Sequence, residues 1–313
     1  MGTKKERNKS MGESATIAMA GREIKLTNLD RVLWPEDGYC KRDLVEYYTA
    51  IFPYMLPHLS ERPLVFTRYP RGIGEKSFYQ KNAPEGLPQW IKTFTWAGSD
   101  GDSKNYVLVQ QTVDLMWLAN LACIEIHPWL SQINSIEYPD FIVFDLDPSE
   151  QSTFEQVISV ARLLHELMDS LSLRVYPKTS GAKGLHLYLP IAEGFTYSQI
   201  RRVAQAMAEM VCQVIPDIAT TERALKHRGP RVYLDYLQNG LGKTVCAAYS
   251  VRPHKGAPCS TPIEWQELES IRPDQFTIKT LPERLQQVGD LFADVLNDRQ
   301  DLKKAMATLG VSR

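Results

Sequence analysis

The clearest pattern in the chain is an apolar run that ends in two acids. Residues 141–144 are four consecutive apolar residues, which is typical of a buried strand, and Asp145 and Asp147 follow at once. Pro148, which has no backbone N–H, would end the strand. Because side chains alternate along a strand, both carboxylates lie on one face, about 7 Å apart. They would repel each other unless a hard divalent cation lay between them, so the pattern is either a cation site or a polar strand end.

Similar patterns along the chain predict the other elements. Apolar runs and alternations bounded by turn residues predict strands at 23–26, 63–70, 90–96, 106–109, 123–129, 174–177, 232–239 and 245–252. Spacings of three and four residues between apolar positions predict helices at 43–52, 112–121, 154–171 and 197–215, with further helical patterns between 281 and 309. No internal repeat is found.

A glycine-containing hairpin is predicted between residues 178 and 190. Ser180, Lys183 and the open backbone at Gly181 and Gly184 resemble a small phosphate cradle. In the strand that follows, His186 points to the face opposite its leucine neighbours. The spacing does not fit a Walker loop, because no Ser or Thr follows the lysine.

A third acid and a basic loop complete this set. Asp235 lies on a predicted strand that follows the basic loop 220–231, and Arg252 ends the next predicted strand. Two divalent ions held by Asp145, Asp147 and Asp235 could activate a hydroxyl and stabilise a leaving pyrophosphate. A triphosphate would then be held by a separate group: Ser180, Lys183, His186 and Arg252. The pattern indicates nucleotidyl transfer.

Two adjacent aromatic residues, Phe78 and Tyr79, follow a glycine-rich loop between Lys76 and Lys81. In a loop, such rings can stack on bases while the lysines contact phosphates. The alternative, one ring buried and the other without a role, is equally consistent with the local sequence.

Three further residues have both a functional and a structural interpretation. His127 ends a predicted strand 18 positions before Asp145, where it could serve the carboxylates or only pack. Arg31 and Lys41 flank a polar turn, where they could bind an anion or be ordinary solvated charges.

Composition restricts the alternatives. The chain has 313 residues, 36 basic and 37 acidic, and a net charge of −1, so any binding of a polyanion must use clustered positive charge. The five cysteines are widely spaced, which favours reduced thiols in a cytosolic protein and argues against a structural zinc site. No apolar run approaches the roughly 20 residues of a membrane span, so no membrane contact is expected. The basic residues 3–10 are not followed by an apolar core, so residues 1–20 are predicted to be a disordered tail rather than a secretory signal.

At these positions the sequence closely resembles the polymerase domain of bacterial ligase D, a branch of the archaeo-eukaryotic primase superfamily. The resemblance runs in order from about residue 22 to about residue 300. The matching stretches are 26–35, 78–81, 114–120, 125–129, 145–148, 179–186 and 235–252.

The resemblance implies an α/β (α+β) fold with mixed and antiparallel sheets, in which helices flank a catalytic module like that of RNA-recognition motifs. It implies one primase-polymerase domain over residues 21–313. The activity would be template-dependent nucleotide addition, preferentially of ribonucleotides, during gap filling in non-homologous end joining, with two Mn²⁺ or Mg²⁺ ions as cofactors.

The resemblance also assigns roles to residues. Asp145, Asp147 and Asp235 would bind the metal ions, with His127 beside the metals or the sugar. The nucleoside triphosphate would contact Ser180, Lys183, His186 and Arg252, with Gln238 and Lys243 nearby. The DNA contacts would be Arg31 and Lys41 at the downstream 5′-phosphate, Phe78, Tyr79 and Lys81 at the template, and Arg228 in a mobile basic loop at DNA ends.

The implied partners are gapped or broken DNA with a 5′-phosphate, Ku and a DNA ligase, in the cytoplasm at the nucleoid. The sequence departs from the family pattern at Arg31, where lysine is common, at Tyr79, where Phe is usual, and at Ala248, where Pro is frequent. Because 313 residues are taken up by the polymerase module, we expect either a stand-alone polymerase or one domain of a longer chain. Three alternatives remain open: a primase or lesion-bypass polymerase, a non-catalytic module that binds DNA ends, and a small-molecule nucleotidyltransferase.

Overall fold

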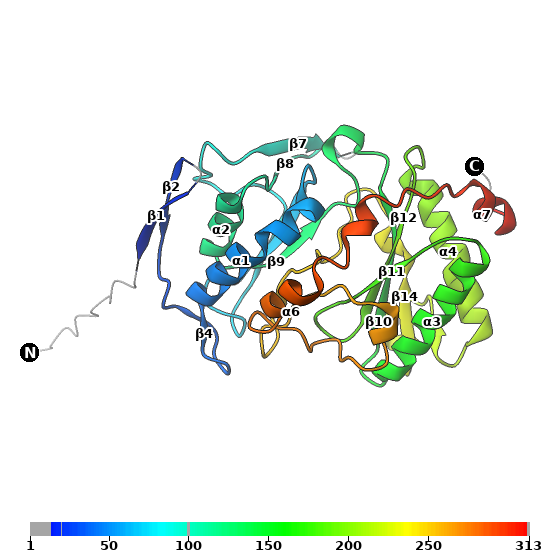
Figure 1. Ribbon diagram of the computed structural model, residues 1–313. Helices are drawn as coiled ribbons and strands as arrows, with labels where there is room; N and C mark the ends of the chain where they lie inside the picture. Colours follow the sequence, from blue (N-terminus) through cyan, green and yellow to red (C-terminus); the bar gives the residue numbers. More distant parts are fainter. Residues whose placement is uncertain (1–13, 20, 99–100, 312–313) are drawn as a thin grey trace, which may run out of the picture.

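Two five-stranded sheets, each accompanied by two helices, form the two halves of the molecule (Figure 1). The computed structural model describes residues 14–311 apart from residues 20, 99 and 100. Two small hairpins precede the first half, and the C-terminal segment runs back along both halves. The fold is therefore the predicted mixture of helices and largely antiparallel sheets.

The second sheet has the strand order β11-β12-β10-β14-β13, antiparallel except for the β13–β14 pair. Its strands are β10 (Phe141–Pro148), β11 (Tyr176–Thr179), β12 (Leu185–Pro190), β13 (Ala219–Thr220) and β14 (Val232–Asp235). Helices α3 (Phe154–Ser170) and α4 (Tyr197–Val214) both pack against β10. Apart from the short β13, this is the β-α-β-β-α-β order of RNA-recognition motifs, so the predicted fold of this module is confirmed.

Local sequence signals explain why α3 and α4 begin where they do. Thr153 and Thr196 cap the two helices, and a glutamine three residues later completes a capping box in each case. The buried residues of α3 recur every three or four positions, which gives one apolar stripe against the sheet. Because the side chains of β10 alternate, Asp145 and Asp147 lie on the face opposite Leu146.

The first half contains the sheet β6-β5-β8-β7, in which β9 also pairs with β5. Its strands are β5 (Leu64–Arg68), β6 (Phe78–Gln80), β7 (Thr93–Ala97), β8 (Ser103–Val107) and β9 (Cys123–Pro128). Helix α2 (Thr112–Asn120) contacts β9, and α1 (Lys41–Leu59) packs along α2. Helix α1 continues beyond the predicted end at residue 52, through Pro53 and Pro57.

The N-terminal hairpins correct one prediction. Strands β1 (Ala15–Met19) and β2 (Arg22–Leu26) pair antiparallel, and β3 (Val32–Trp34) pairs with β4 (Tyr39–Cys40). The predicted tail over residues 1–20 is thus wrong at β1, where alternate residues are half-buried against the core. Residues 1–13 and 20 lie outside the described residues.

The C-terminal segment joins the two halves. Helix α6 (Leu281–Val288) contacts α1, and the 3₁₀ turn η4 (Ala293–Leu296) contacts both α1 and β12. Helix α7 (Lys303–Thr308) lies at the far end of the second half (Figure 1). The remaining short elements are α5 (Leu225–Arg228), η1 (Ile133–Ser135), η2 (Tyr236–Gln238) and η3 (Trp265–Glu267). Among the described helices, none is both long enough and apolar enough to cross a membrane.

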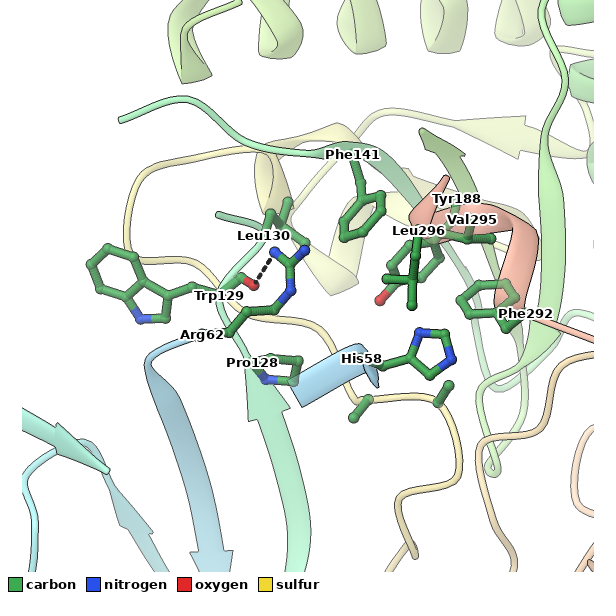
Figure 2. Close-up of a pocket in the computed structure, with 12 residues that line it drawn as sticks. His58, Arg62, Pro128, Trp129, Leu130, Phe141, Tyr188, Phe292, Val295 and Leu296 are labelled. Atoms are coloured by element: carbon green, nitrogen blue, oxygen red, sulfur yellow. Dashed lines mark hydrogen bonds between the residues drawn. The ribbon is translucent and has the colours of Figure 1, made fainter. Parts of the chain in front are cut away.

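Side chains from both halves meet in a buried cluster (Figure 2). Arg62, which follows α1, donates to the Trp129 carbonyl at 3.4 Å and to Asp140 Oδ2 at 2.5 Å. Its guanidinium also lies 4.8 Å from the centre of the Phe141 ring on β10. His58 Nε2 lies 2.9 Å from Asp290 Oδ2 of the C-terminal segment, within hydrogen-bonding distance. These contacts fix one sheet relative to the other.

Two predicted strands are wrong in whole or in part. Residues 245–252 form no strand: Tyr249 has a φ of 69°, and Arg252 N donates to the Pro258 carbonyl at 2.7 Å. The run is apolar because it is a buried loop, and a short apolar run alone does not distinguish the two. The strand predicted at 232–239 ends at Asp235, whose side chain accepts from Leu237 N and begins η2.

The C-terminal segment supplies a stability prediction. Asp298 accepts from Arg174 Nε at 2.7 Å, from the Arg174 Nη2 atom and from Tyr176 Oη at 2.9 Å. The Arg174 bond holds the pKa of Asp298 below its usual value. Because Arg174 is 70% exposed, we expect Asp298→Ala to lower the free energy of unfolding by only about 1 kcal/mol at pH 7.

This difference should depend on pH. The folded pKa of Asp298 is lowered, so its stabilisation is complete above the unfolded pKa near 4 and is lost as pH falls through the folded value. Urea unfolding of wild type and variant at pH 7 and at decreasing pH measures this. A difference that stays constant down to the most acidic pH would contradict the assignment.

Candidate active site

Four side chains from four adjacent strands form a row across the second sheet. Lys178 on β11 pairs with His186 on β12, His186 pairs with Asp145 on β10, and Asp145 pairs with Asp235 on β14. Residues directly opposite each other on neighbouring strands point to the same face. Strand register therefore brings together three predicted site residues and Lys178, which the sequence did not single out.

The three acids each have polar partners. His186 Nε2 lies 3.3 Å from Asp145 Oδ1, and Arg228 Nη1 donates to Asp147 Oδ2 at 3.0 Å. Asp235 accepts at 2.9 to 3.1 Å from Tyr233 Oη, Leu237 N and Gln238 Nε2. Asp145 is the central acid of the three.

The pKa shifts of the acids reflect burial first and the neighbouring charges second. Burial alone would raise the pKa of Asp145, but the neighbouring His186, Arg252 and Lys178 hold it below the usual value. Burial, and then the charge of Asp145, raise the pKa of both Asp147 and Asp235. A bound cation would relieve this repulsion.

A cleft of about 380 Å³ opens beside the two central residues of this row, His186 and Asp145, whereas Lys178 and Asp235 do not line it. Asp145 and Asp147 line one part of it, and the other lining residues come from the hairpin, β12, β9 and the loops after β14. The predicted site residues in its wall are His127, Asp145, Asp147, Ser180, Lys183, His186, Gln238 and Arg252. The structure thus gathers most of the predicted metal and nucleotide residues around one cavity.

The hairpin between β11 and β12 is pressed tightly against β10. Ser180 Oγ accepts from Ala182 N at 3.1 Å and from Gly184 N at 3.0 Å, so its hydroxyl hydrogen is left to donate elsewhere. A Cβ atom at Gly184 would lie 2.0 Å from the Leu146 carbonyl oxygen, between the two acids of β10. Lys183 is exposed at the tip of the turn. The glycines are therefore needed for close approach.

His127 and Arg252 complete the wall of the cleft from the other half. Burial, followed by the charges of Arg252 and Lys178, lowers the pKa of His127 to about 3, so the imidazole is neutral at neutral pH. Arg252 Nε forms an ion pair with Glu125 Oε1 at 3.2 Å, and Tyr69 Oη donates to the same carboxylate at 3.1 Å. Sequence reasoning missed Glu125, although it lies two residues before His127 on β9.

Arg31 and Lys41 lie together at the start of α1, in the half opposite the acids (Figure 1). Lys41 is only 3% exposed, and its Nζ donates to Asn120 O at 2.8 Å and Oδ1 at 3.2 Å. Burial, then the charge of Arg31, lower its pKa to about 8. Arg31 is exposed and donates to the Pro70 carbonyl at 2.8 Å. The alternative of two solvated surface charges is wrong for Lys41.

The two adjacent aromatic rings lie on the surface strand β6. Phe78 is 50% exposed and Tyr79 is 60% exposed, so the alternative with one buried ring is wrong. Phe78 lines a hollow of about 480 Å³ together with Arg68 and Lys76. Exposed rings beside cations are suited to stacking on bases.

Three other predicted residues, Lys81, Lys243 and Arg228, do not belong to the row of four side chains. Lys81 and Lys243 line a second hollow of about 250 Å³, which also contains Trp96 and Trp129. Arg228 is 6% exposed, on the short helix α5. Its guanidinium lies 4.0 Å from the centre of the Tyr233 ring and contacts Asp147, so Arg228 reaches the acids themselves.

The carboxylates are suitable ligands for a divalent cation, but their side chains are not arranged around a single point where one ion could bind. In residues 14–311, apart from the three undescribed positions between them, no three Asp, Glu, His or Cys side chains are close enough to hold one ion together. Arg228 instead occupies Asp147 Oδ2. Carboxylates gathered on one face, two of them with pKa values raised by burial and then by the charge of Asp145, are nevertheless suitable ligands for Mg²⁺ or Mn²⁺.

Comparisons with known proteins identify the family of the chain. A family model described as "LigD, primase-polymerase domain" matches residues 40–292. The chain is 35% identical over 281 residues to the bifunctional non-homologous end joining protein LigD of Bacillus subtilis, covering 89% of this chain and 45% of the relative. It is 33% identical over 272 residues to the multifunctional LigD of Mycolicibacterium smegmatis, covering 86% and 36%. The chain thus spans less than half the length of these relatives.

A solved structure is also similar over nearly the whole domain. The polymerase domain from Mycobacterium tuberculosis ligase D, solved in complex with DNA, matches with a TM-score of 0.82 and 30% sequence identity. The match covers 88% of this chain and 99% of that one. The predicted primase-like fold is therefore confirmed.

Proposed function

Because the chain belongs to the family of LigD primase-polymerase domains, we propose that it is a template-dependent nucleotidyltransferase that fills gaps at DNA double-strand breaks in non-homologous end joining. The observation that carries this proposal is the strand register that aligns His186, Asp145 and Asp235, because His186 and Asp145 also line the cleft. Nucleotidyl transfer needs acids and phosphate-binding groups on one face of the sheet. The pairing of β10 with β12 and β14 supports this proposal because it puts His186 and the two acids on the same face.

In this proposal Asp145, Asp147 and Asp235 hold two Mn²⁺ or Mg²⁺ ions. Such ions supply activation of the primer 3′-hydroxyl and neutralisation of the leaving pyrophosphate. Ser180 donates its free hydroxyl hydrogen to the triphosphate, and His186, whose Nε2 lies 3.3 Å from Asp145 Oδ1, contacts the triphosphate next to the acids.

The remaining residues of the cleft position the nucleotide. Lys183 and Arg252 supply positive charge for the triphosphate, with Gln238 and Lys243 beside them. Neutral His127 lies beside the metals or the sugar, where a preference for ribonucleotides would require a contact with the 2′-hydroxyl.

The other half contacts DNA in this proposal. Arg31 and Lys41 bind the 5′-phosphate of the downstream strand, with exposed Arg31 as the first contact. Phe78 and Tyr79 stack on template bases, and Lys81 contacts the backbone. Arg228 acts at the DNA end next to Asp147. These local clusters of positive charge are sufficient for DNA binding despite the net charge of −1, because each phosphate contact needs only a few cations.

The biological setting is part of the same proposal. Gap filling would precede sealing by a DNA ligase after Ku holds the ends, on chromosomal DNA at the nucleoid. The runner-up function is a primase or lesion-bypass polymerase with the same chemistry. A non-catalytic end-binding module has no need of three acids held together, so the intact set favours an enzyme.

The experiment that tests this assignment is extension on gapped DNA with and without a downstream 5′-phosphate. Arg31→Gln should remove most of the stimulation by the phosphate, about tenfold, because it deletes the exposed charge of the pair. It should leave extension of the unphosphorylated gap unchanged. Lys304→Gln is the matched control, since this exposed lysine lies on α7 at the opposite end of the molecule (Figure 1).

The outcomes separate the candidate functions. Stimulation by the phosphate that depends on Arg31 supports end joining. Synthesis of primers from nucleotides alone, with no effect of the phosphate, favours the primase. Ribo- and deoxyribonucleotides compared in the same assay measure the sugar preference.

The stacking role gives a further prediction. Tyr79→Ala should weaken binding of template overhangs by about 1 to 3 kcal/mol, because a base loses its stacking partner. Thermal stability should hardly change, since the ring is 60% exposed. Fluorescence anisotropy with a labelled overhang measures the affinity, and Tyr138→Ala, another exposed tyrosine, serves as control. Equal affinity for wild type and the Tyr79 variant would contradict stacking.

A further inference from the structure

The second hollow, of about 250 Å³, lies between the β7–β8 hairpin and the loop that follows η2. Its wall includes three aromatic rings, Trp96, Tyr106 and Trp129, and Lys81 and Lys243 also line it. The proposed function places the two lysines near DNA and near the nucleotide, but it uses none of the three rings. We call this cavity the tryptophan hollow.

Strand register and ring contacts build the floor of the tryptophan hollow. Trp96 on β7 lies directly opposite Lys104 on β8, and Tyr106 is two residues further along β8, so the three side chains share one face. The centre of the Trp129 ring lies 5.7 Å from that of Trp96 and 5.2 Å from that of Tyr106, in edge-on contacts. Figure 2 shows that this ring points away from the buried cluster between the halves. Trp129 and Tyr106 are buried and Trp96 is half-buried, so Trp96 supplies the accessible ring.

The loop 240–244 forms another part of the wall. An isolated backbone bridge joins Thr244 to Trp129, and a Cβ atom at Gly242 would lie 3.5 Å from Trp129 Cζ2, so the loop is held against the floor. Leu241, which is 40% exposed, adds an apolar side chain to this wall. The hollow is therefore formed before any ligand binds, which lowers the entropy cost of binding.

The side chains around the hollow carry positive charge. Lys81 and Lys243 are exposed, and within the described part of the chain their ammonium groups have no hydrogen bond or ion pair. Lys104 also lines the hollow, where it pairs with Asp102. Two unpaired cations beside an accessible indole fit a ligand with a planar ring and negative charge close to it. This is the chemistry of one nucleotide unit.

The surroundings of the hollow favour a DNA strand over a free nucleotide. Lys81 follows Tyr79 by two residues, and Tyr79 is also a neighbour of Tyr106, because burial and, to a smaller extent, Tyr79 raise the pKa of Tyr106. At the other side, Lys243 is adjacent to Thr244, which lines the cleft of the candidate active site. The hollow therefore lies on a path from the exposed ring of Tyr79 to that cleft.

We propose that the tryptophan hollow holds one unpaired base of the template strand on Trp96, with the flanking phosphates on Lys81 and Lys243. The choice of the template strand rests on the proposed function, whereas recognition of a base does not. The cavity is smaller than the roughly 300 to 1,000 Å³ usual for a whole small-molecule ligand, which fits a single base whose sugar and phosphates stay outside. Stacking on a ring tolerates any base, as a template site requires. Lys243 then lies between this base and the incoming nucleotide.

The test pairs a missing base with a missing ring. Fluorescence anisotropy measures the affinity for a labelled duplex with a single-stranded overhang, in which one nucleotide at a time is replaced by an abasic one. We expect one abasic position to weaken binding about tenfold in the wild type and in Tyr79→Ala. The same position should have no effect in Trp96→Leu, which keeps an apolar side chain against Trp129 but removes the ring.

Two variants control for structural effects of the substitution. Trp96→Phe keeps a ring and should retain most of the tenfold effect. Trp265→Ala, at a half-buried tryptophan of η3 in the second half, should retain all of it. Urea unfolding establishes that each variant is folded.

The phosphate contacts are tested through salt dependence. Lys81→Gln should weaken binding alike at every abasic position and lower the slope of log affinity against log salt concentration by about 0.7, the value for one phosphate of a single strand. Lys304→Gln, at the opposite end of the molecule, should leave the slope unchanged. An unchanged slope in Lys81→Gln would overturn the phosphate contact.

The abasic positions decide the central point. The proposal is overturned when the wild type has no sensitive position, or when every sensitive position stays sensitive in Trp96→Leu. Trp96-dependent binding of a free nucleoside monophosphate, without any sensitive position, would place a free nucleotide in the hollow and would also overturn it. None of these measurements requires catalysis. A Trp96-dependent position in a protein that extends no primer would contradict the proposed function and leave the base site in place.

Discussion

Asp145→Asn should lower kcat for nucleotide addition by about 10³-fold. Asp145 lies between His186 and Asp235 in the row, and its pKa is held below the usual value, so it is charged at any pH of assay. Asparagine keeps the shape and one acceptor oxygen but removes the charge that would hold a cation. The change also removes the charge that helps to raise the pKa values of Asp147 and Asp235. Those two carboxylates therefore stay ionised, but they cannot take over the role of Asp145.

Single-turnover extension of a gapped primer measures this loss, and DNA affinity measured in parallel should change little. Asp169→Asn, which removes an exposed carboxylate on α3, is the matched control and should stay within about twofold of wild type. A fall in the rate of less than tenfold would contradict the assignment of Asp145 as a metal ligand.

Gly184→Ala should nearly abolish activity and lower the free energy of unfolding by about 3 kcal/mol or more. The new methyl group would lie 2.0 Å from the Leu146 carbonyl oxygen and 3.2 Å from Pro148 Cδ. The first neighbour is backbone, so relief requires β10 or the hairpin to move. Because Leu146 lies between Asp145 and Asp147, either movement shifts the acids relative to Ser180.

Urea unfolding and the extension assay together measure the two effects. Gly74→Ala is the control, because a Cβ there would meet nothing within 4 Å. Wild-type stability and activity in Gly184→Ala would show that the hairpin does not press on β10 as described.

The strands and helices of the second sheet could be predicted from the sequence because their signals are local. The apolar run before Asp145, the caps at Thr153 and Thr196 and the glycines of the hairpin each lie within a few residues of the element they specify. The alternation of side chains along a strand is equally local, and it is sufficient to place Asp145 and Asp147 on one face.

What could not be predicted depends on contacts between distant residues. Lys178 matters through its register with β12 and its contact with Ser260, 82 positions away. The segment 245–252 resembles a strand in sequence because it is apolar, but it is a buried loop whose hydrogen-bond partners include Ser260 and Pro258. Tyr249 adopts a positive φ there, and no local residue indicates this.

The predictions of a disordered tail and of a mobile basic loop were wrong for a similar reason. Strand β1 has only a weak alternation of its own and becomes ordered by pairing with β2. Arg228 was predicted in a mobile loop, but its guanidinium is held by Asp147 and by the Tyr233 ring. Neither contact is visible in the spacing of residues along the chain.

The central claim is that this cleft transfers a nucleotide to a primer end. The most direct test is extension of a labelled primer across a one-nucleotide gap by the wild-type chain, with Mn²⁺ and a single complementary nucleoside triphosphate. We predict that the primer grows by one templated nucleotide, faster with the ribonucleotide than with the deoxyribonucleotide. A primer that stays unextended while the protein binds the gapped DNA would contradict the claim and leave an end-binding module.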